Sequence, residues 1–165
     1  MPDLTPMERF AGVEMNNGVD ISILTSGDSQ TEEYASLADM FKNYNVALNE
    51  QIYNAMYLAD QGYGCAQVTG MSPTVGLTGD FNPNDPACAY LESIQYKTGA
   101  DRVSKIKMNR GNQSLTCPVT LTSIAIAGGD AGQPNSVSVT IAFDGKPTVT
   151  DRPTNSGSGS GSSNP

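Results

Sequence analysis

The sequence of 165 residues contains no histidine and no tryptophan. Without histidine, serine–histidine and cysteine–histidine catalysis are excluded, and the commonest metal-binding side chain is missing. The three cysteines, Cys65, Cys88 and Cys117, form no C-x-x-C pair, and an odd number cannot make a closed disulfide framework. We therefore interpret them as free thiols of a protein made in a reducing cytosol.

Long apolar runs are missing as well. None approaches the ~20 residues that a helix needs to cross a bilayer. Residues 1–14 hold two carboxylates before the first basic residue, Arg9, and no apolar stretch, so they do not form a secretory signal. We expect no membrane association.

Positive charge is scarce, because 9 Lys and Arg stand against 17 Asp and Glu, a net charge of −8. This balance argues against a basic nucleic-acid-binding surface as the main function. Residues 1–95 hold 13 carboxylates and 2 basic residues, whereas residues 96–165 hold 4 and 7. Five of the basic residues fall within residues 97–110. Either this basic stretch is a solvated strand face, or acidic and basic surfaces join copies head to tail. The candidate interface residues are Arg102, Lys105, Lys107, Arg110, Asp28, Glu32 and Glu33.

Alternation of apolar and polar residues predicts a β-rich domain. The expected strands cover residues 18–25, 73–81, 102–109, 114–127 and 136–143. In the fourth strand the apolar phase changes near Thr122 and Ser123, which predicts a β-bulge. Pro118 cannot donate to a ladder, so we expect it at an edge or a bulge.

One helix is predicted from residue 86 to about residue 97. Asp85 is a good N-cap, Pro86 falls at the first helical position, and Gly99 stands just past the end. The apolar face of this helix indicates core packing rather than a ligand site.

Residues 34–58 fit two patterns. Apolar residues recur at steps of three or four, as in an amphipathic helix. Around residues 52–58, however, apolar side chains also fit a strand that exposes them on both faces, and three nearby asparagines are poor helix formers. The local pattern leaves both structures open.

No motif predicts catalysis or cofactor binding. The glycine-rich stretches 76–79 and 128–132 match neither the G-x-x-x-x-G-K-[ST] pattern nor the G-x-G-x-x-G pattern of nucleotide-binding loops. The carboxylates of residues 28–33 lack the ligand spacing of a calcium loop, which favours a solvated acidic loop. Asp80 and Asp85 are a conceivable glycosidase pair, but Asp85 is already explained as a helix cap. We predict no catalytic residue, no cofactor and no metal.

A series of short motifs carries a family resemblance. They lie, in order, at residues 57–64, 68–70, 78–80, 85–87, 96–102, 117–120, 128–130 and 143–147. Together, over about residues 48–150, they resemble the major tail (tail tube) proteins of long-tailed bacteriophages, especially siphophages of Gram-positive hosts.

The resemblance implies a mainly β fold, a sandwich or barrel flanked by one α-helix, with an extended N-terminal arm and a long inter-ring loop. It also favours extended structure for residues 34–58, with a long loop or hairpin that reaches between rings. It implies hexameric rings that stack into a hollow tube through which the genome leaves. Such a protein belongs to the virion tail, is assembled in the host cytoplasm around a tape-measure protein, and meets terminator and baseplate proteins. Lumen carboxylates would repel DNA phosphates, so DNA would pass without specific binding.

We therefore predict a tail tube domain over residues 1–150 and a flexible Gly/Ser-rich tail over residues 151–165. The arm, residues 1–14, and a loop region, residues 26–49, are expected to stack the rings. Two alternatives remain: a tube subunit of a contractile tail or secretion-like particle, and a carbohydrate-binding virion decoration module. The chain has only 11 Phe and Tyr residues, and this small number argues against the second alternative, because carbohydrate-binding modules display clustered aromatic side chains.

Overall fold

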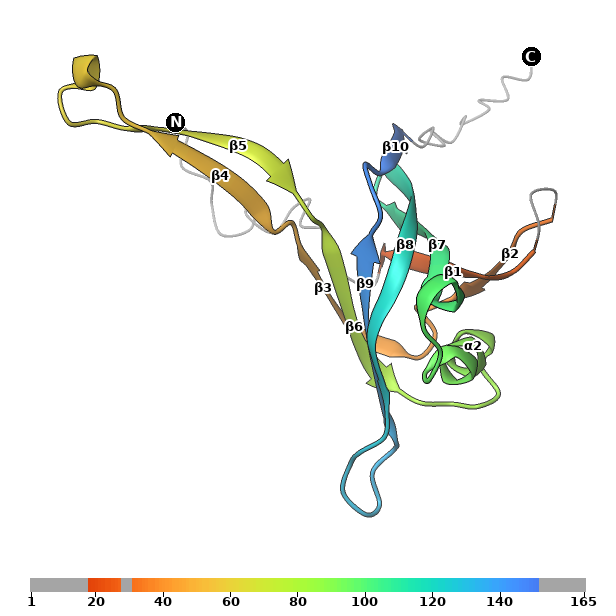
Figure 1. Cartoon of the computed structure of the whole chain (residues 1–165). Helices are drawn as coiled ribbons and strands as arrows, with labels where there is room; N and C mark the ends of the chain where they lie inside the picture. Colours follow the sequence, from red (N-terminus) through yellow and green to blue (C-terminus); the bar gives the residue numbers. More distant parts are fainter. Residues whose placement is uncertain (1–17, 28–30, 152–165) are drawn as a thin grey trace, which may run out of the picture.

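The computed structural model describes residues 18–27 and 31–151 (Figure 1). The elements in chain order are β1 (Asp20–Ser26), β2 (Glu33–Ser36), β3 (Phe41–Ala47), β4 (Glu50–Ala55), η2 (Leu58–Asp60), β5 (Cys65–Met71), β6 (Thr74–Asp80), α2 (Pro86–Ile94), η3 (Gly99–Arg102), β7 (Val103–Arg110), β8 (Gln113–Ile126), β9 (Ser136–Phe143) and β10 (Thr148–Asp151). The expected fold, mainly β with one α-helix, is confirmed for this part of the chain. The expected N-terminal arm, residues 1–14, lies outside the described residues.

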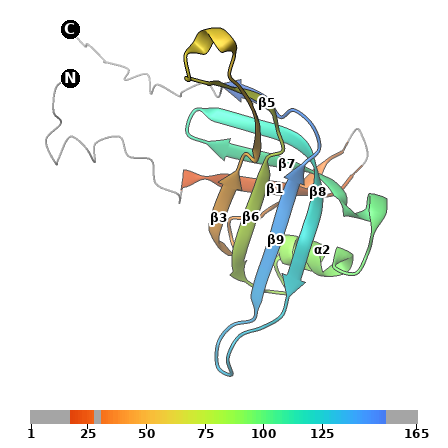
Figure 2. The same ribbon diagram turned by 60° about the vertical axis from the view of Figure 1, so that its left-hand side comes forward.

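One large antiparallel sheet builds the body, in the order β2-β1-β7-β8-β9-β6-β3, with β10 added to β8. The long strand β8 serves both halves of this sheet, because residues 113–120 pair with β7 and residues 119–126 pair with β9. Figure 2 shows β3, β6 and β9 side by side, with β1 and β7 crossing behind them. The sheet thus folds over itself into a sandwich, and the strands at its two ends, β2 and β3, are not paired with each other in the described structure.

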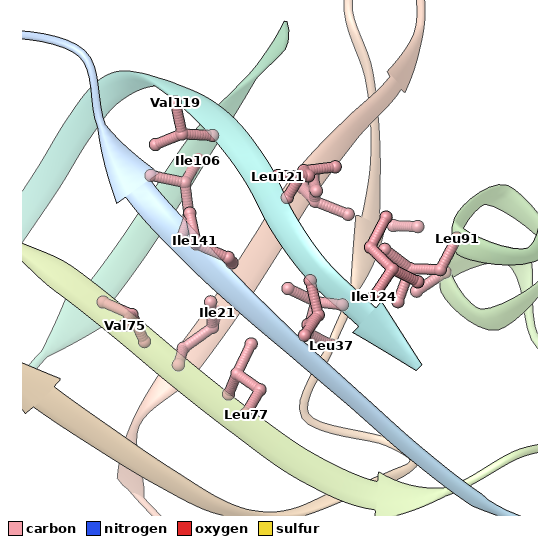
Figure 3. Packing of buried hydrophobic residues seen from close by; sticks show 14 of the residues in the cluster. Ile21, Leu37, Val75, Leu77, Leu91, Ile106, Val119, Leu121, Ile124 and Ile141 are labelled. Atoms are coloured by element: carbon pink, nitrogen blue, oxygen red, sulfur yellow. The ribbon is translucent and has the colours of Figure 1, made fainter. Parts of the chain in front are cut away.

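The core fills the space between the two layers, and the alternation seen in the sequence supplies it. In β9, Val137, Val139 and Ile141 are buried, as their spacing predicts. Figure 3 shows Ile21, Leu37 and Leu77, from separate segments, pointing into the same apolar interior. Each such side chain contributes about 1.5–3 kcal/mol when it leaves water.

Helix α2 closes one end of the sandwich and follows its sequence signals. The Asp85 carboxylate accepts a hydrogen bond from the Cys88 backbone N–H at 2.9 Å, which caps the first turn. Leu91 and Ile94 are buried in the core. The helix ends at Ile94, three residues earlier than predicted, and its C-cap is Gln95 in a right-handed conformation. Gly99 has a positive φ of +65°, but it begins η3 and does not cap α2, which corrects the prediction.

Strand β8 contains the predicted bulge. Its register with β9 shifts between Thr122 and Ala125, and Ser123 has a φ of 50°. Pro118, however, lies neither at a bulge nor on an outer strand, which corrects the prediction. On the side of β8 away from β7, β9 pairs with residues 119–126 and β10 pairs with residues 113–116, so Pro118 lies between these two partner strands. Its carbonyl accepts a hydrogen bond from the Asp144 N–H at 2.9 Å. The gap between two partner strands tolerates a residue that cannot donate.

Residues 34–58 are extended, so the helical alternative is wrong. They contribute to β2, β3 and β4, with a turn at residues 37–40 and the start of η2 at Leu58. The region expected to be a loop, residues 26–49, therefore contains two strands, and its described loop between strands β2 and β3 is short. Strands β5 and β10 were not predicted.

Candidate self-assembly surfaces

The most prominent surface feature is an arm made of β4, η2 and β5. These two strands pair only with each other, and Figure 1 shows them reaching away from the sandwich. The arm continues the β3–β6 pair, since β4 follows β3 and β6 follows β5 after two residues each. It is therefore a long hairpin whose lower half belongs to the body and whose upper half stands free.

The base of the arm is held by one asparagine. Asn49 has a φ of 48°, a left-handed conformation that asparagine tolerates better than most residues. Its side-chain amide donates to the Ser72 carbonyl at 2.9 Å and to Thr74 Oγ1 at 3.3 Å. The Ser72 N–H in turn donates to the Leu48 carbonyl at 3.1 Å. These bonds fix the direction in which the arm leaves the body.

The arm exposes apolar side chains on both faces. Ile52 lies opposite Val68 in the ladder, and Tyr53 lies opposite Gln67, so neighbouring pairs point to opposite sides. Ile52, Tyr53 and Val68 are all exposed. A two-stranded ribbon is marginally stable alone in water, and large exposed apolar surfaces mark sites of association. The arm is thus a candidate surface for association with another molecule.

The tip of the arm is an ordered apolar knob, which we define as Met56, Tyr57, Leu58 and Tyr63. Leu58 is fully exposed and Tyr63 is 82% exposed. Asp60 organises this turn, because its carboxylate accepts from the Tyr57 N–H at 2.7 Å and its carbonyl accepts from the Tyr63 N–H at 2.9 Å. The apolar side chains are therefore presented on a defined backbone.

These arm residues were not among the candidate interface residues. The signal was present in the sequence, because apolar residues in both phases of residues 52–58 indicate a strand without a buried face. Strand β5 had no comparable signal, since Gln67 and Thr69 alternate only weakly with Ala66 and Val68.

Part of the predicted interface set forms an acid–base cluster, which we define as Glu32, Tyr34, Lys105 and Lys107. The Glu32 carboxylate pairs with the Lys105 ammonium and accepts a hydrogen bond from the Tyr34 hydroxyl at 2.8 Å. The Lys107 ammonium lies 3.8 Å from the centre of the Tyr34 ring. This cluster ties the segment before β2 to β7 within one chain.

The cluster changes the titration of two of its members. The hydrogen bond from Lys105, and then that from Tyr34, lowers the pKa of Glu32 below its ordinary value. Burial, and then the hydrogen bond to Glu32, raises the pKa of Tyr34 to about 12. At neutral pH the carboxylate is ionised and the phenol is protonated, which is the state in which both bonds form.

The other predicted interface residues are dispersed. Glu33 accepts a hydrogen bond from the Ser26 hydroxyl at 2.7 Å, and Arg110 ends β7 with an exposed side chain. Asp28 lies outside the described residues. The Arg102 guanidinium is turned into its own chain and donates to three backbone carbonyls. These are Gln95 at 2.5 Å, Lys97 at 2.8 Å and Leu121 at 3.2 Å.

The described residues offer little for chemistry. No group of three or more His, Cys, Asp or Glu side chains within residues 18–27 and 31–151 could hold a metal ion. No helix in the same part of the chain is long and apolar enough to span a membrane. Burial raises the pKa of the Cys88 and Cys117 thiols, whereas Cys65, on the arm, is exposed.

No protein family and no curated protein sequence matches the chain. Solved structures share its fold. A chain in the tail of an empty gene transfer agent particle, with C6 symmetry, superimposes with a TM-score of 0.67 at 13% identity, covering 84% of this chain and 99% of that one. A chain of the SPP1 tail tube gives a TM-score of 0.64 at 12% identity, with coverages of 85% and 80%.

A chain of the sheath–tube complex of an extracellular contractile injection system is also similar. Its TM-score is 0.51 at 12% identity, with 91% of this chain and 99% of that chain covered. At identities this low, the structural similarity shows a common fold and nothing more. The protein therefore has the fold of chains that occur in the SPP1 tail tube and in the gene transfer agent tail.

Proposed function

We propose that this chain is the repeating subunit of a tail tube, a structural virion protein that polymerises as stacked hexameric rings and conducts DNA to the host. One observation carries the proposal: the arm exposes apolar side chains on both faces of a ribbon that nothing in the described chain covers. Because the fold is that of chains in C6-symmetric tails, copies of the same chain are the natural cover.

Within this class we favour the tail of a siphophage with a Gram-positive host, on the order of the motifs over residues 48–150. The further partners are then a tape-measure protein inside the tube and terminator and baseplate proteins at its ends. Assembly would take place in the host cytoplasm. In this proposal residues 1–150 form the tube domain, while residues 1–14 and 26–49 help to stack the rings and residues 151–165 form an appended tail.

The charge of the chain suits a DNA conduit. With a net charge of −8 per subunit, a ring of several copies carries a strongly negative field that repels phosphate groups. A duplex would slide through such a tube without being held. Catalysis and a bound cofactor form no part of this role.

The acid–base cluster and Arg110 are proposed to face the neighbouring subunit within a ring. The cluster is held rigid by its own hydrogen bonds, so it presents the Lys107 charge in a fixed place. Complementary charges of this kind set the register of an interface more than its strength.

Negative-stain electron microscopy of the concentrated, purified chain tests the proposed function. Hollow tubes or stacked rings of uniform diameter are expected. A chain that sediments as a monomer at every concentration and forms no tube would contradict the proposal.

The alternative of a contractile particle has one observation in its favour, the fold shared with the sheath–tube complex of a contractile injection system. A sheath protein around the tube, in particles isolated with this chain, would distinguish that alternative from a non-contractile tail.

A further inference from the structure

We propose that the apolar knob of one copy inserts into a groove between β1 and β3 of the next copy. This inference rests on the proposed self-assembly, and it adds the surface that receives the arm. The knob is convex and the groove concave, so each copy offers one of each.

The groove lies where the sheet does not close. It has a volume of about 470 Å³, and its lining comes from β1, the segment after β2, the start of β3, and β6. Val19, Ile21, Leu37 and Leu77 form an apolar floor, and these residues belong to the buried core. An apolar side chain placed there would continue that core, which favours its binding.

The rim of the groove holds one exposed cation that a carboxylate of the arm could approach. Lys42 lies on the rim, and its side chain is 69% exposed although its ammonium is 2.6 Å from the Asp80 carboxylate. The arm has no basic residue between positions 48 and 72, whereas it carries Glu50 near its base and Asp60 at its tip. An incoming knob would therefore bring its carboxylate to a rim that holds an accessible ammonium.

Knob and groove lie at opposite ends of one hairpin. Phe41, which lines the groove, begins β3, and the arm starts after Ala47, which ends that strand. Strand β3 spans about 20 Å and β4 adds a similar length, since a strand rises ~3.4 Å per residue. Copies joined by knob and groove would thus be related head to tail along the strands.

In this head-to-tail arrangement two copies leave one knob and one groove unfilled. The contact is then heterologous, so it continues from copy to copy until it closes into a ring or extends as a filament. A tube built of stacked subunits requires a contact of this kind.

Disulfide trapping tests the contact. In a Cys65→Ser background, Leu58→Cys on the knob is combined with Asn43→Cys on the groove rim, and the assembled protein is oxidised with copper–phenanthroline. A ladder of covalent multimers is expected on a denaturing gel. The matched control combines Leu58→Cys with Tyr96→Cys, another exposed position outside the groove, and is expected to give no ladder.

The outcomes separate the two proposals. Tubes without a ladder would overturn the knob-and-groove contact and leave the tail tube function intact. A ladder of short multimers without tubes would support the contact and contradict the tube. A third pair combines Phe10→Cys with Asn43→Cys. If this pair forms the covalent multimers and the pair with Leu58→Cys does not, the N-terminal segment occupies the groove and this inference is wrong.

A second pair of variants avoids oxidation. Leu58→Asp places a charge on the knob, and we expect it to abolish assembly while the melting temperature of the isolated chain stays unchanged. Tyr96→Asp, an equally exposed aromatic position outside the knob, is expected to assemble as the unmodified chain does. Normal assembly of Leu58→Asp would overturn the inference.

Discussion

Glu32 is shared by two donors, Lys105 and Tyr34, so its charge is linked to the titration of the phenol. The raised pKa of Tyr34 means that its bond contributes stability below pH 10, and that this contribution is lost as the pH rises towards about 12. The lowered pKa of Glu32 has the opposite sense, because its contribution is present above the ordinary value and is lost as the pH falls through the lowered one.

We expect Glu32→Gln to lower the pKa of Tyr34 from about 12 without restoring the ordinary value of 10, since burial remains the larger cause of the shift. Absorbance titration of tyrosinate measures this change. Subtracting the curve of Tyr34→Phe isolates the signal of Tyr34 from those of the other tyrosines. An unchanged Tyr34 titration in Glu32→Gln would show that the carboxylate does not hold the phenol.

Arg102 acts within its own chain, where it joins the residues after α2 to β8. We expect Arg102→Gln to lower the free energy of unfolding by about 2 kcal/mol, because hydrogen bonds from a charged donor are lost and backbone carbonyls lose partners. Urea denaturation of the isolated chain measures this effect. Lys146→Gln removes the same charge at an exposed position and should leave stability unchanged; equal effects would refute the role given to Arg102.

At the scale of elements, the cap of α2 is the clearest local determinant. Asp85→Ala removes the acceptor for the Cys88 N–H and should cost about 1 kcal/mol of stability. Thermal unfolding followed by circular dichroism measures the loss. Glu92→Ala deletes a carboxylate at an exposed position of the same helix, and a loss as large as that of Asp85→Ala would mean that capping is not the cause.

The elements that the sequence predicts are those that bury one face in the core of the same chain. Strand β9 alternates because one face meets the core, and α2 carries its cap and stop within a few residues. Strand β10 has four exposed residues and depends on pairing with β8, so its own residues contain no burial pattern.

The family resemblance implied a loop or hairpin within residues 34–58, but the local pattern alone did not identify the arm, for the same reason. Ile52 and Tyr53 point to opposite sides, and neither side is buried in a single copy. A prediction from the local pattern assumes that one face of a strand is buried within the same chain, and the arm has no such face. The candidate interface was predicted from charge, which identified Glu32 and Lys105, but charge carries no information on the apolar knob.

For the whole molecule, the proposed interface predicts a defect in polymerisation. Lys105→Glu with Lys107→Glu reverses the charge of the cluster and should impair tube formation, because like charges then meet at the contact and the Glu32 pair is lost. Sedimentation velocity and electron microscopy measure assembly, and circular dichroism checks that the fold persists.

The matched control for this variant is Lys97→Glu with Lys146→Glu, which makes the same change in net charge at exposed positions outside the cluster. We expect it to assemble normally. Unchanged tubes from the cluster variant would remove these lysines from the interface, while leaving the arm as the main contact.

Cys65 gives the chain a built-in probe. Its thiol is exposed beside the turn of the arm, whereas burial protects those of Cys88 and Cys117. A maleimide dye would therefore label the native chain at one place without any substitution. Fluorescence anisotropy of that dye would follow the arm from free solution into its final surroundings in real time.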